Sequence, residues 1–302
     1  MSRCIVFEDG NIIQNINEIT VWNGLGSRML KNGEIIQFIQ KNLPENSIFV
    51  IPRSDGNVIK NKNEGEYEDV NWSEIEPHID YARKKNKVFI LGVLSQITED
   101  TEVNCVYLPL DDDFFKNGIS IYFPESSLIP WKERSQELFW RGGCSGIGGN
   151  KSLRVKFVEI IQEYEKTSKV FLSKWWSENK NIPNNLFADR VDYKEFLKYK
   201  YFFIVDGNVI ASSHMWGFAS GCVPFMISNG IHWFSSFIKP YIHYIPVEYD
   251  LSNLIHQIEY VRSNDDVAEN ISKNAVEFSK TFFSSDFQKE YLRHNLNRFS
   301  KK

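Results

Sequence analysis

A glycine-rich loop between a short apolar strand and an amphipathic helix is the feature that most constrains this chain. Five glycines fall within residues 142–149, directly after the apolar run that begins at Leu138. Glycine allows main-chain N–H groups to close on a ligand at backbone angles that other residues resist. The N-terminus of the following helix adds unpaired donors and a partial positive charge. This order of elements predicts a loop that holds a phosphorylated ligand.

Two arginines flank the loop and favour phosphate as the bound anion. Arg141 precedes the first glycine and Arg154 stands at the start of the helix. Guanidinium groups make charge-assisted, fork-shaped contacts with phosphate oxygens. The alternative is a flexible surface loop before an ordinary helix, because glycine-rich loops are common without any ligand.

Two familiar phosphate-binding patterns do not fit the spacing of the glycines. Gly143 and Gly148 satisfy the first half of G-x-x-x-x-G-K-[ST], but Gly149 and Asn150 follow where Lys and Ser or Thr belong. The dinucleotide fingerprint G-x-G-x-x-G, with an acidic residue about twenty positions later, does not occur either. The spacing therefore disfavours a kinase or NTPase that uses residues 142–154 to bind a nucleotide.

Strand-like and helix-like segments alternate along the chain, which favours parallel sheets covered by helices on both faces. We expect strands at residues 47–51, 88–94, 103–108, 170–172, 201–205, 223–227 and 244–247. We expect helices at residues 33–42, 73–85, from 153 onward, 251–262, 266–282 and 286–299. A chain of 302 residues suits two α/β domains of roughly 130–150 residues each. The proline-containing segment 124–137 is the best candidate for the boundary between them.

Composition excludes several classes of partner and chemistry. A net charge of −4 disfavours a nucleic-acid binder that relies on a broad basic surface. The sequence contains neither an apolar run long enough to span a membrane nor an early signal-peptide pattern, so we expect a cytoplasmic protein. The cysteines are far apart and form no CxxC pair, which predicts reduced thiols instead of a disulfide framework or zinc site. They are Cys4, Cys105, Cys144 and Cys222.

An ordered series of short motifs runs through the second half of the chain. It comprises residues 139–143 (Phe-Trp-Arg-Gly-Gly), Arg154, residues 198–201 (Lys-Tyr-Lys-Tyr), 206–208 (Asp-Gly-Asn), 220–225, 239–247, 250–254 and 264–268. In this order the motifs resemble glycosyltransferase family 90, which includes Rumi-type protein O-glucosyltransferases and capsule-associated xylosyltransferases. The resemblance is dense over residues 139–283 and thin before them.

The resemblance implies a GT-B-like α/β fold, in which two Rossmann-like domains face an interdomain cleft. Residues 1–135 would form the acceptor-side domain and residues 136–283 the UDP-sugar-binding domain, with a C-terminal helix at 284–302 available to pack back on the first. It further implies an inverting, metal-independent transfer of glucose or xylose from a UDP-sugar to a glycan or protein hydroxyl, without a cofactor. A catalytically inactive relative that binds a sugar or nucleotide is the alternative.

Residue-by-residue matching to the family gives a donor-binding set. Relatives usually carry Ser-x-Arg in the segment after the Lys-Tyr-Lys-Tyr strand, and this chain has Ala211 and Ser213 at those two positions. That departure implies a changed donor, weakened binding or loss of activity. His214, one position further on, either donates to phosphate or packs inside the domain at the start of a helix. The predicted set is Arg141, Gly142, Gly143, Arg154, Asn208, Ala211, Ser212, Ser213 and His214.

One carboxylate in the first half is the candidate catalytic base. Residues 49–56 match the family strand that ends in Arg-Asp, with Ser54 in place of the Arg and Asp55 at the catalytic Asp. An inverting transfer needs one carboxylate to take the proton of the acceptor hydroxyl. The alternative is a turn aspartate, because Ser-Asp-Gly is a common turn sequence.

A second acidic segment, Asp111-Asp112-Asp113, suggests a different kind of glycosyltransferase. A D-x-D pattern is typical of GT-A enzymes, in which carboxylates hold a divalent metal against UDP. The glycine-rich loop and the C-terminal motifs belong to the other architecture. We therefore interpret the acidic run as a loop near the acceptor entrance or a solvated turn, and predict no metal site.

Overall fold

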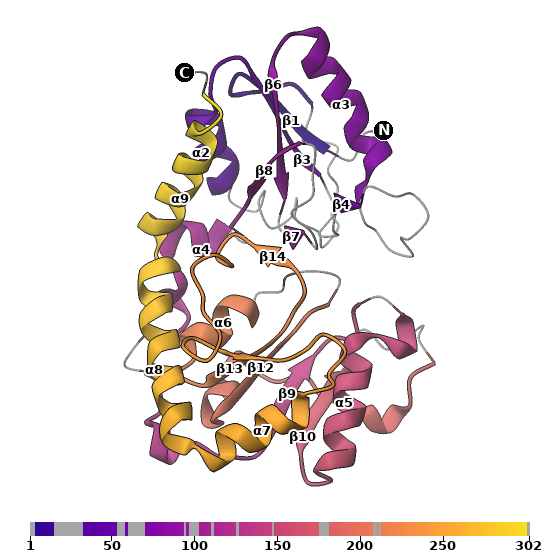
Figure 1. Ribbon diagram of the computed structural model, residues 1–302, viewed down its shortest axis with the longest axis vertical. Coiled ribbons are helices and arrows are strands. Elements are labelled where there is room, and N and C mark those ends of the chain that lie inside the picture. The colour runs from indigo at the N-terminus through magenta and orange to yellow at the C-terminus, as the bar shows by residue number, and fades with distance from the viewer. Residues whose placement is uncertain are drawn as a thin grey trace. The chain divides into compact units, whose positions relative to one another are not determined.

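The chain forms two compact α/β units (Figure 1). Unit 1 comprises Met1–Gly118, Gly230–Ser236 and Ser284–Lys302, and unit 2 comprises Ile119–Asn229 and Phe237–Phe283. The computed structural model describes residues 4–14, 33–52, 58–59, 70–93, 95–96, 103–109, 112–124, 127–146, 148–174, 181–207, 210 and 213–300. No helix in these ranges is long and apolar enough to cross a membrane.

Unit 1 is built on a five-stranded sheet in the order β2-β1-β3-β6-β8. Its strands are β1 (Cys4–Glu8), β2 (Asn11–Ile12), β3 (Ser47–Pro52), β6 (Val88–Val93) and β8 (Asn104–Tyr107). β3, β6 and β8 are parallel, whereas β1 runs antiparallel to both of its neighbours. Two short pairs accompany the sheet: β4 (Val58–Ile59) with β5 (Val70–Asn71), and β7 (Ser95–Gln96) with β14 (Ile231–His232).

Helices bury the apolar strands of unit 1. α3 (Trp72–Lys84) places Ile75, Ile79 and Ala82 against Val50 and Leu91 of the sheet. A second group of helices, α2 (Glu34–Asn42), α4 (Asp112–Asn117) and α9 (Ser285–Asn297), pack on one another. All six residues of β3 are buried, because both of its faces are covered and its side chains are almost all apolar.

Unit 2 contains two three-stranded parallel sheets that lie side by side. One has the order β11-β10-β9, formed by β9 (Phe139–Gly142), β10 (Lys169–Ser173) and β11 (Phe187–Ala188). The other has the order β12-β13-β15, formed by β12 (Tyr201–Val205), β13 (Val223–Ile227) and β15 (Ile245–Pro246). β9 and β12 are neighbours, joined just before their starts by a parallel bridge between Ser135 and Tyr199 (Figure 1). The strands therefore follow the order β11-β10-β9-β12-β13-β15.

Helices surround these sheets and fix the positions of the strand ends. They are α5 (Leu153–Tyr164), α6 (Ser213–Ala219), α7 (Leu254–Ser263) and α8 (Asp265–Phe282). Phe157 of α5 packs its ring against Trp140 of β9 and Phe203 of β12. α6 lies so close to β12 that a Cβ on Gly217 would come within 2.7 Å of Ile204 Cδ1.

Short 3₁₀ segments complete the described backbone. They are η2 (Ile119–Ile121), η4 (Trp131–Glu133), η5 (Gly149–Lys151), η7 (Asn184–Leu186) and η8 (Tyr193–Lys198). The chain enters unit 2 at Ile119, whose N–H donates to the Phe283 carbonyl at 3.2 Å. It contributes Gly230–Ser236 to unit 1 and returns there for the last time at Ser284. Which unit serves the acceptor and which the donor stays a prediction.

Candidate functional site

The carboxyl ends of β9 and β12 form a topological switch point in unit 2. From β9 the chain builds outward to β11, and from β12 it builds outward in the opposite direction to β15. Ligands of open α/β sheets bind outside the carboxyl ends of the strands at such a reversal. The glycine-rich loop follows β9, and the segment from Asp206 to α6 follows β12. The two predicted donor segments thus begin at neighbouring strand ends.

Arg154 joins the two strand-end loops. Its Nη1 donates to the Gly143 carbonyl at 3.1 Å and to Ser145 Oγ at 2.8 Å, both in the loop after β9. Its Nη2 donates to the Val205 carbonyl at 2.9 Å, and its Nε lies 3.1 Å from the carbonyls of Val205 and Asp206, at the end of β12. Only 7% of the residue is exposed. Burial lowers the pKa of the guanidinium to about 10, and the Asp206 carboxylate opposes that shift.

Glycines permit the close approach of these loops. A Cβ on Gly207 would lie 2.6 Å from Ser145 Oγ and 3.1 Å from Arg154 Cζ, so no larger residue fits without displacing them. Gly146 and Gly148 have φ values of +119° and +95°, which strongly favour glycine. The loop is therefore held by contacts to the end of β12 and to Arg154.

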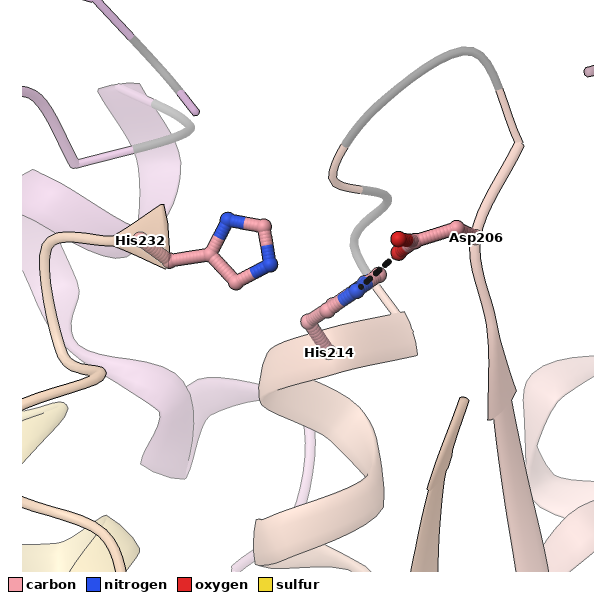
Figure 2. Close-up of side chains that lie close together, drawn as sticks. All are labelled: Asp206, His214 and His232. Carbon is pink, nitrogen blue, oxygen red and sulfur yellow. Dashed lines mark hydrogen bonds and ion pairs between the residues drawn. The ribbon is translucent and has the colours of Figure 1, made fainter. Parts of the chain in front are cut away.

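A buried carboxylate–imidazole pair lies beside this junction. Asp206 follows β12 directly, and His214 stands in the first turn of α6. The His214 Nε2 and Asp206 Oδ1 atoms are 2.8 Å apart, and Figure 2 shows the two side chains pointing toward each other. Both residues are buried. A carboxylate bonded to one ring nitrogen fixes the orientation of the imidazole ring.

Sequence reasoning named His214 but did not select Asp206. The available signal was an acidic residue immediately after a buried strand, at the edge where α/β proteins bind ligands. Ser213, the first residue of α6, is half-buried.

Arg141 contacts backbone carbonyls and an aromatic ring of the neighbouring strands and of the segment after β11. Its Nη1 donates to the carbonyls of Trp140 and Lys169, each at 2.9 Å, and its Nε donates to the Asp189 carbonyl at 3.2 Å. The guanidinium also lies over the ring of Phe171, and burial lowers its pKa. These contacts brace β9 against β10 and the segment after β11, whereas Arg154 contacts the loops.

Tyr249 adds an aromatic side chain at the same edge of unit 2. It follows β15, the last strand of the parallel series, and 40% of the residue is exposed. Burial of its hydroxyl raises its pKa, the Asp206 carboxylate raises it further, and the Arg154 guanidinium lowers it. The phenol is therefore within electrostatic reach of both groups. Sequence analysis did not single out this residue.

Several predicted positions lie outside the described residues. They are Asp55, Asn208, Ala211, Ser212 and Asp111. Asp112 and Asp113 begin α4, but their side chains are not among those described. Gly142 ends β9, where a Cβ would come within 2.4 Å of the Trp140 ring, so the strand must end in glycine at this point.

Comparison with known proteins identifies the family. The profile of Glycosyl transferase family 90 matches residues 123–302, which is more than half of the chain. The chain belongs to glycosyltransferase family 90. It is 25% identical over 295 residues to protein 035R of Invertebrate iridescent virus 3, a match that covers 88% of this chain and 26% of that protein. It is 28% identical over 178 residues to Protein O-glucosyltransferase 1 of Homo sapiens, covering 57% of this chain and 43% of that protein.

This family 90 chain thus spans less than half the length of these two curated relatives. Among solved structures, a glycosyltransferase from Rickettsia africae ESF-5 aligns with a TM-score of 0.48 and 13% identity, covering 93% of this chain and 96% of that chain. The family match begins at Phe123 and therefore includes Arg154, Asp206, His214 and Tyr249. Asp55 lies before it.

Proposed function

We propose that this chain transfers a sugar from a UDP-sugar to a hydroxyl group of a glycan or protein, with inversion at C1 and without a metal or cofactor. One observation carries the proposal. Within the family 90 match, two loops meet at a topological switch point around a buried guanidinium. The human relative is named as an O-glucosyltransferase, so UDP-glucose is the first donor to test and UDP-xylose the second.

The electrostatics of the switch point support a diphosphate at this position. The N-terminus of α5 contributes a partial positive charge and unpaired N–H groups directly after the glycine-rich loop. The Arg154 cation lies at the same junction. Such fixed donors and charges stabilise negative charge as it develops on a leaving group. The proposed donor site comprises Gly142, Gly143, Arg154, Asn208, Ala211, Ser212, Ser213 and His214, with Arg141 bracing the strands beneath it.

The proposed chemistry is a single displacement. The Asp55 carboxylate takes the proton of the acceptor hydroxyl as that oxygen attacks C1 of the donor sugar. The bond between C1 and the β-phosphate oxygen breaks, and UDP leaves with its electron pair at the junction of the two loops. Asp55 follows β3 in the sequence, three positions after its last residue, Pro52.

Release of UDP tests this function directly. The folded chain would be incubated with UDP-glucose, UDP-xylose and further UDP-sugars, with ADP-glucose and GDP-glucose as controls for the base. Glycan and protein acceptors would be supplied together and separately. We expect acceptor-dependent UDP release with at least one UDP-sugar and none with the ADP or GDP donors.

Two other outcomes have definite meanings. UDP binding without release from any donor would indicate the inactive relative, which Ser213 at the position of the usual arginine also favours. Absence of UDP binding would show that the donor assignment is wrong.

A further inference from the structure

We propose that Tyr249 is a further donor-binding residue, whose phenolic hydroxyl donates a hydrogen bond to the diphosphate of the UDP-sugar. The inference rests on the proposed function, because it extends the same diphosphate site to a third strand end. To the loops after β9 and β12 it adds an uncharged hydrogen-bond donor from the turn after β15.

Backbone hydrogen bonds place Tyr249 at the same edge of the sheet as the two loops. The Asp206 N–H donates to the Ile227 carbonyl at 3.1 Å, which joins the ends of β12 and β13. The Val247 N–H donates to the Met226 carbonyl at 3.0 Å, which joins β13 to the residue after β15. Because neighbouring strands lie about 4.8 Å apart, the ends of β12 and β15 are about 10 Å apart. Tyr249 follows two residues later, at the carboxyl end of this series of strands.

The turn that carries Tyr249 is held in place by hydrogen bonds. The Leu251 N–H donates to the Glu248 carbonyl at 2.8 Å, which closes a four-residue turn with Tyr249 at its second position. The Glu248 N–H donates in turn to Asn253 Oδ1 at 2.9 Å. A side chain on a turn fixed in this way loses less conformational freedom on binding a ligand than one on a mobile loop.

The hydroxyl of Tyr249 is not used within the described part of the chain. Two other exposed tyrosines of unit 2 do use theirs: Tyr164 donates to Glu259 Oε1 at 3.4 Å, and Tyr241 accepts from Gln257 Nε2 at 2.8 Å. The Tyr249 side chain, in contrast, forms neither a hydrogen bond nor a ring contact with any residue that the structure describes. Since 40% of the residue is exposed, its hydroxyl can reach a ligand at this edge.

The charges around the phenol favour a phosphate as that ligand. Burial is the largest effect on the pKa of Tyr249 and raises it, so the phenol keeps its proton at neutral pH and can donate. The Asp206 carboxylate also raises this pKa, and the Arg154 guanidinium lowers it. Burial lowers the pKa of Arg154, and the phenol is among the groups that oppose that shift. The hydroxyl therefore lies in the field of the cation at the proposed diphosphate site, while the Asp206 carboxylate is already paired with His214.

The experiment compares Tyr249→Phe with Tyr249→Leu. Phenylalanine removes the hydroxyl alone, whereas leucine removes the aromatic ring as well. The affinities of the folded proteins for UDP and for inorganic pyrophosphate would be measured by calorimetry. We expect Tyr249→Phe to weaken the binding of both ligands by about tenfold, as for the loss of one hydrogen bond to a charged group. Tyr249→Leu should weaken them by a similar factor.

Tyr164→Phe is the matched control. Tyr164 is also an exposed tyrosine of unit 2, and it is the last residue of α5. At a rise of 1.5 Å per residue, it lies roughly 17 Å along the helix from the end that follows the glycine-rich loop. This variant should leave the affinities for UDP and pyrophosphate unchanged.

The results that contradict the inference differ from those that contradict the proposed function. Unchanged binding of both ligands by Tyr249→Phe, when the wild-type chain binds both, would refute the inference alone. UDP affinity retained by phenylalanine and lost by leucine would show that the ring stacks on the base, and weaker UDP with unchanged pyrophosphate would place the hydroxyl on the nucleoside. A wild-type chain that binds pyrophosphate but not UDP would refute the proposed function, and Tyr249→Phe would still test the hydroxyl against pyrophosphate. Binding of neither ligand would refute both.

Discussion

Arg134 and Arg154 are two buried arginines that use the same bonding pattern at opposite ends of the strands of unit 2. Each points its guanidinium at backbone carbonyls from two strand ends. Each has a glycine packed against it, because a Cβ on Gly221 would lie 2.6 Å from Arg134 Nη2 and one on Gly207 would lie 3.1 Å from Arg154 Cζ. What differs is the chemistry around them.

At the amino-terminal ends of the strands, the group that contacts Arg134 is a buried thiol. Arg134 Nη1 lies 3.1 Å from Cys222 Sγ, and burial raises the pKa of that thiol, so the cysteine stays neutral. At the carboxyl-terminal end, Arg154 Nε lies 3.1 Å from the Asp206 carbonyl, and the Asp206 carboxylate is paired with His214. Burial raises the pKa of Tyr249, and the Arg154 guanidinium opposes that larger effect. A buried arginine that donates to strand-end carbonyls is therefore not by itself evidence for a ligand site. In unit 2, the difference lies in the side chains found at each end of the strands.

The largest expected effect on sugar transfer is that of replacing Asp55, which belongs to neither of the two groups of residues compared above. If Asp55 is the general base, Asp55→Asn should slow sugar transfer by about two to four orders of magnitude and spare UDP binding. The amide keeps the shape of the side chain but cannot accept the proton of the acceptor. Transfer rate and UDP affinity would be measured on the same preparation. The two measurements separate the chemical step from the donor binding that we propose for unit 2.

Asp80→Asn is a suitable control, because Asp80 is an exposed carboxylate on α3 of unit 1. It should leave the rate unchanged. Near-normal transfer by a folded Asp55→Asn protein would indicate a turn aspartate, since asparagine also serves well in turns.

Gly207 and Gly221 allow a direct test of whether the two ends of the strands in unit 2 differ in ligand binding. Gly207→Ala places a Cβ 2.6 Å from Ser145 Oγ and should force the loops apart. We expect UDP affinity to fall by about tenfold, comparable to the loss of one charge-assisted hydrogen bond. Calorimetry with UDP measures the effect. Replacing Ser145 by Gly in the same chain removes the nearest obstructing atom and should restore part of the affinity.

The matching change at the other end should affect stability alone. Gly221 has φ +70°, and an alanine there would also press on Arg134 Nη2. Gly221→Ala should lower the free energy of unfolding by about 1–3 kcal/mol, through backbone strain and displacement of a buried side chain. Chemical denaturation gives that value. A loss of UDP affinity in folded Gly221→Ala protein equal to that of Gly207→Ala would remove the distinction between the ends.

Part of this arrangement follows from sequence pattern. The predicted strands at 201–205 and 223–227 match β12 and β13 to the residue, because strands buried on both faces are unbroken apolar runs. The helix predicted from 251 begins instead at Leu254. Leu251 has φ +67°, and the Asp250 side chain accepts from the Ser252 N–H, so a turn occupies the first positions. β1 was missed, since a run of four apolar residues does not distinguish a strand from other buried segments.

The side-chain geometry of the site could not be predicted from the sequence pattern. Arg141 and Arg154 look alike in the sequence, since both flank the glycines. Strand alternation places Arg141 on the face of Phe139, over its ring, while the first turn of α5 directs Arg154 to the end of β12. The pairing of Asp206 with His214 joins the residue after β12 to the first turn of α6, eight positions further along the sequence. Such contacts require the three-dimensional structure.

The smallest expected effect on the rate is that of metal removal. This experiment tests whether the diphosphate is stabilised at the carboxyl-terminal end of unit 2 or by a metal bound to the acidic run Asp111-Asp112-Asp113. We expect the initial rate of UDP release to persist in excess EDTA. Under the proposed function, the leaving diphosphate is neutralised by backbone N–H groups, the N-terminus of α5 and the nearby guanidinium, so no cation is needed. The double variant Asp111→Asn/Asp113→Asn should likewise leave the rate unchanged.

Loss of activity in EDTA with rescue by manganese, together with loss of activity in that double variant, would indicate that Asp111 and Asp113 are metal ligands. The reaction would then depend on a metal held outside unit 2, and the proposed metal-free donor site at the switch point would be wrong.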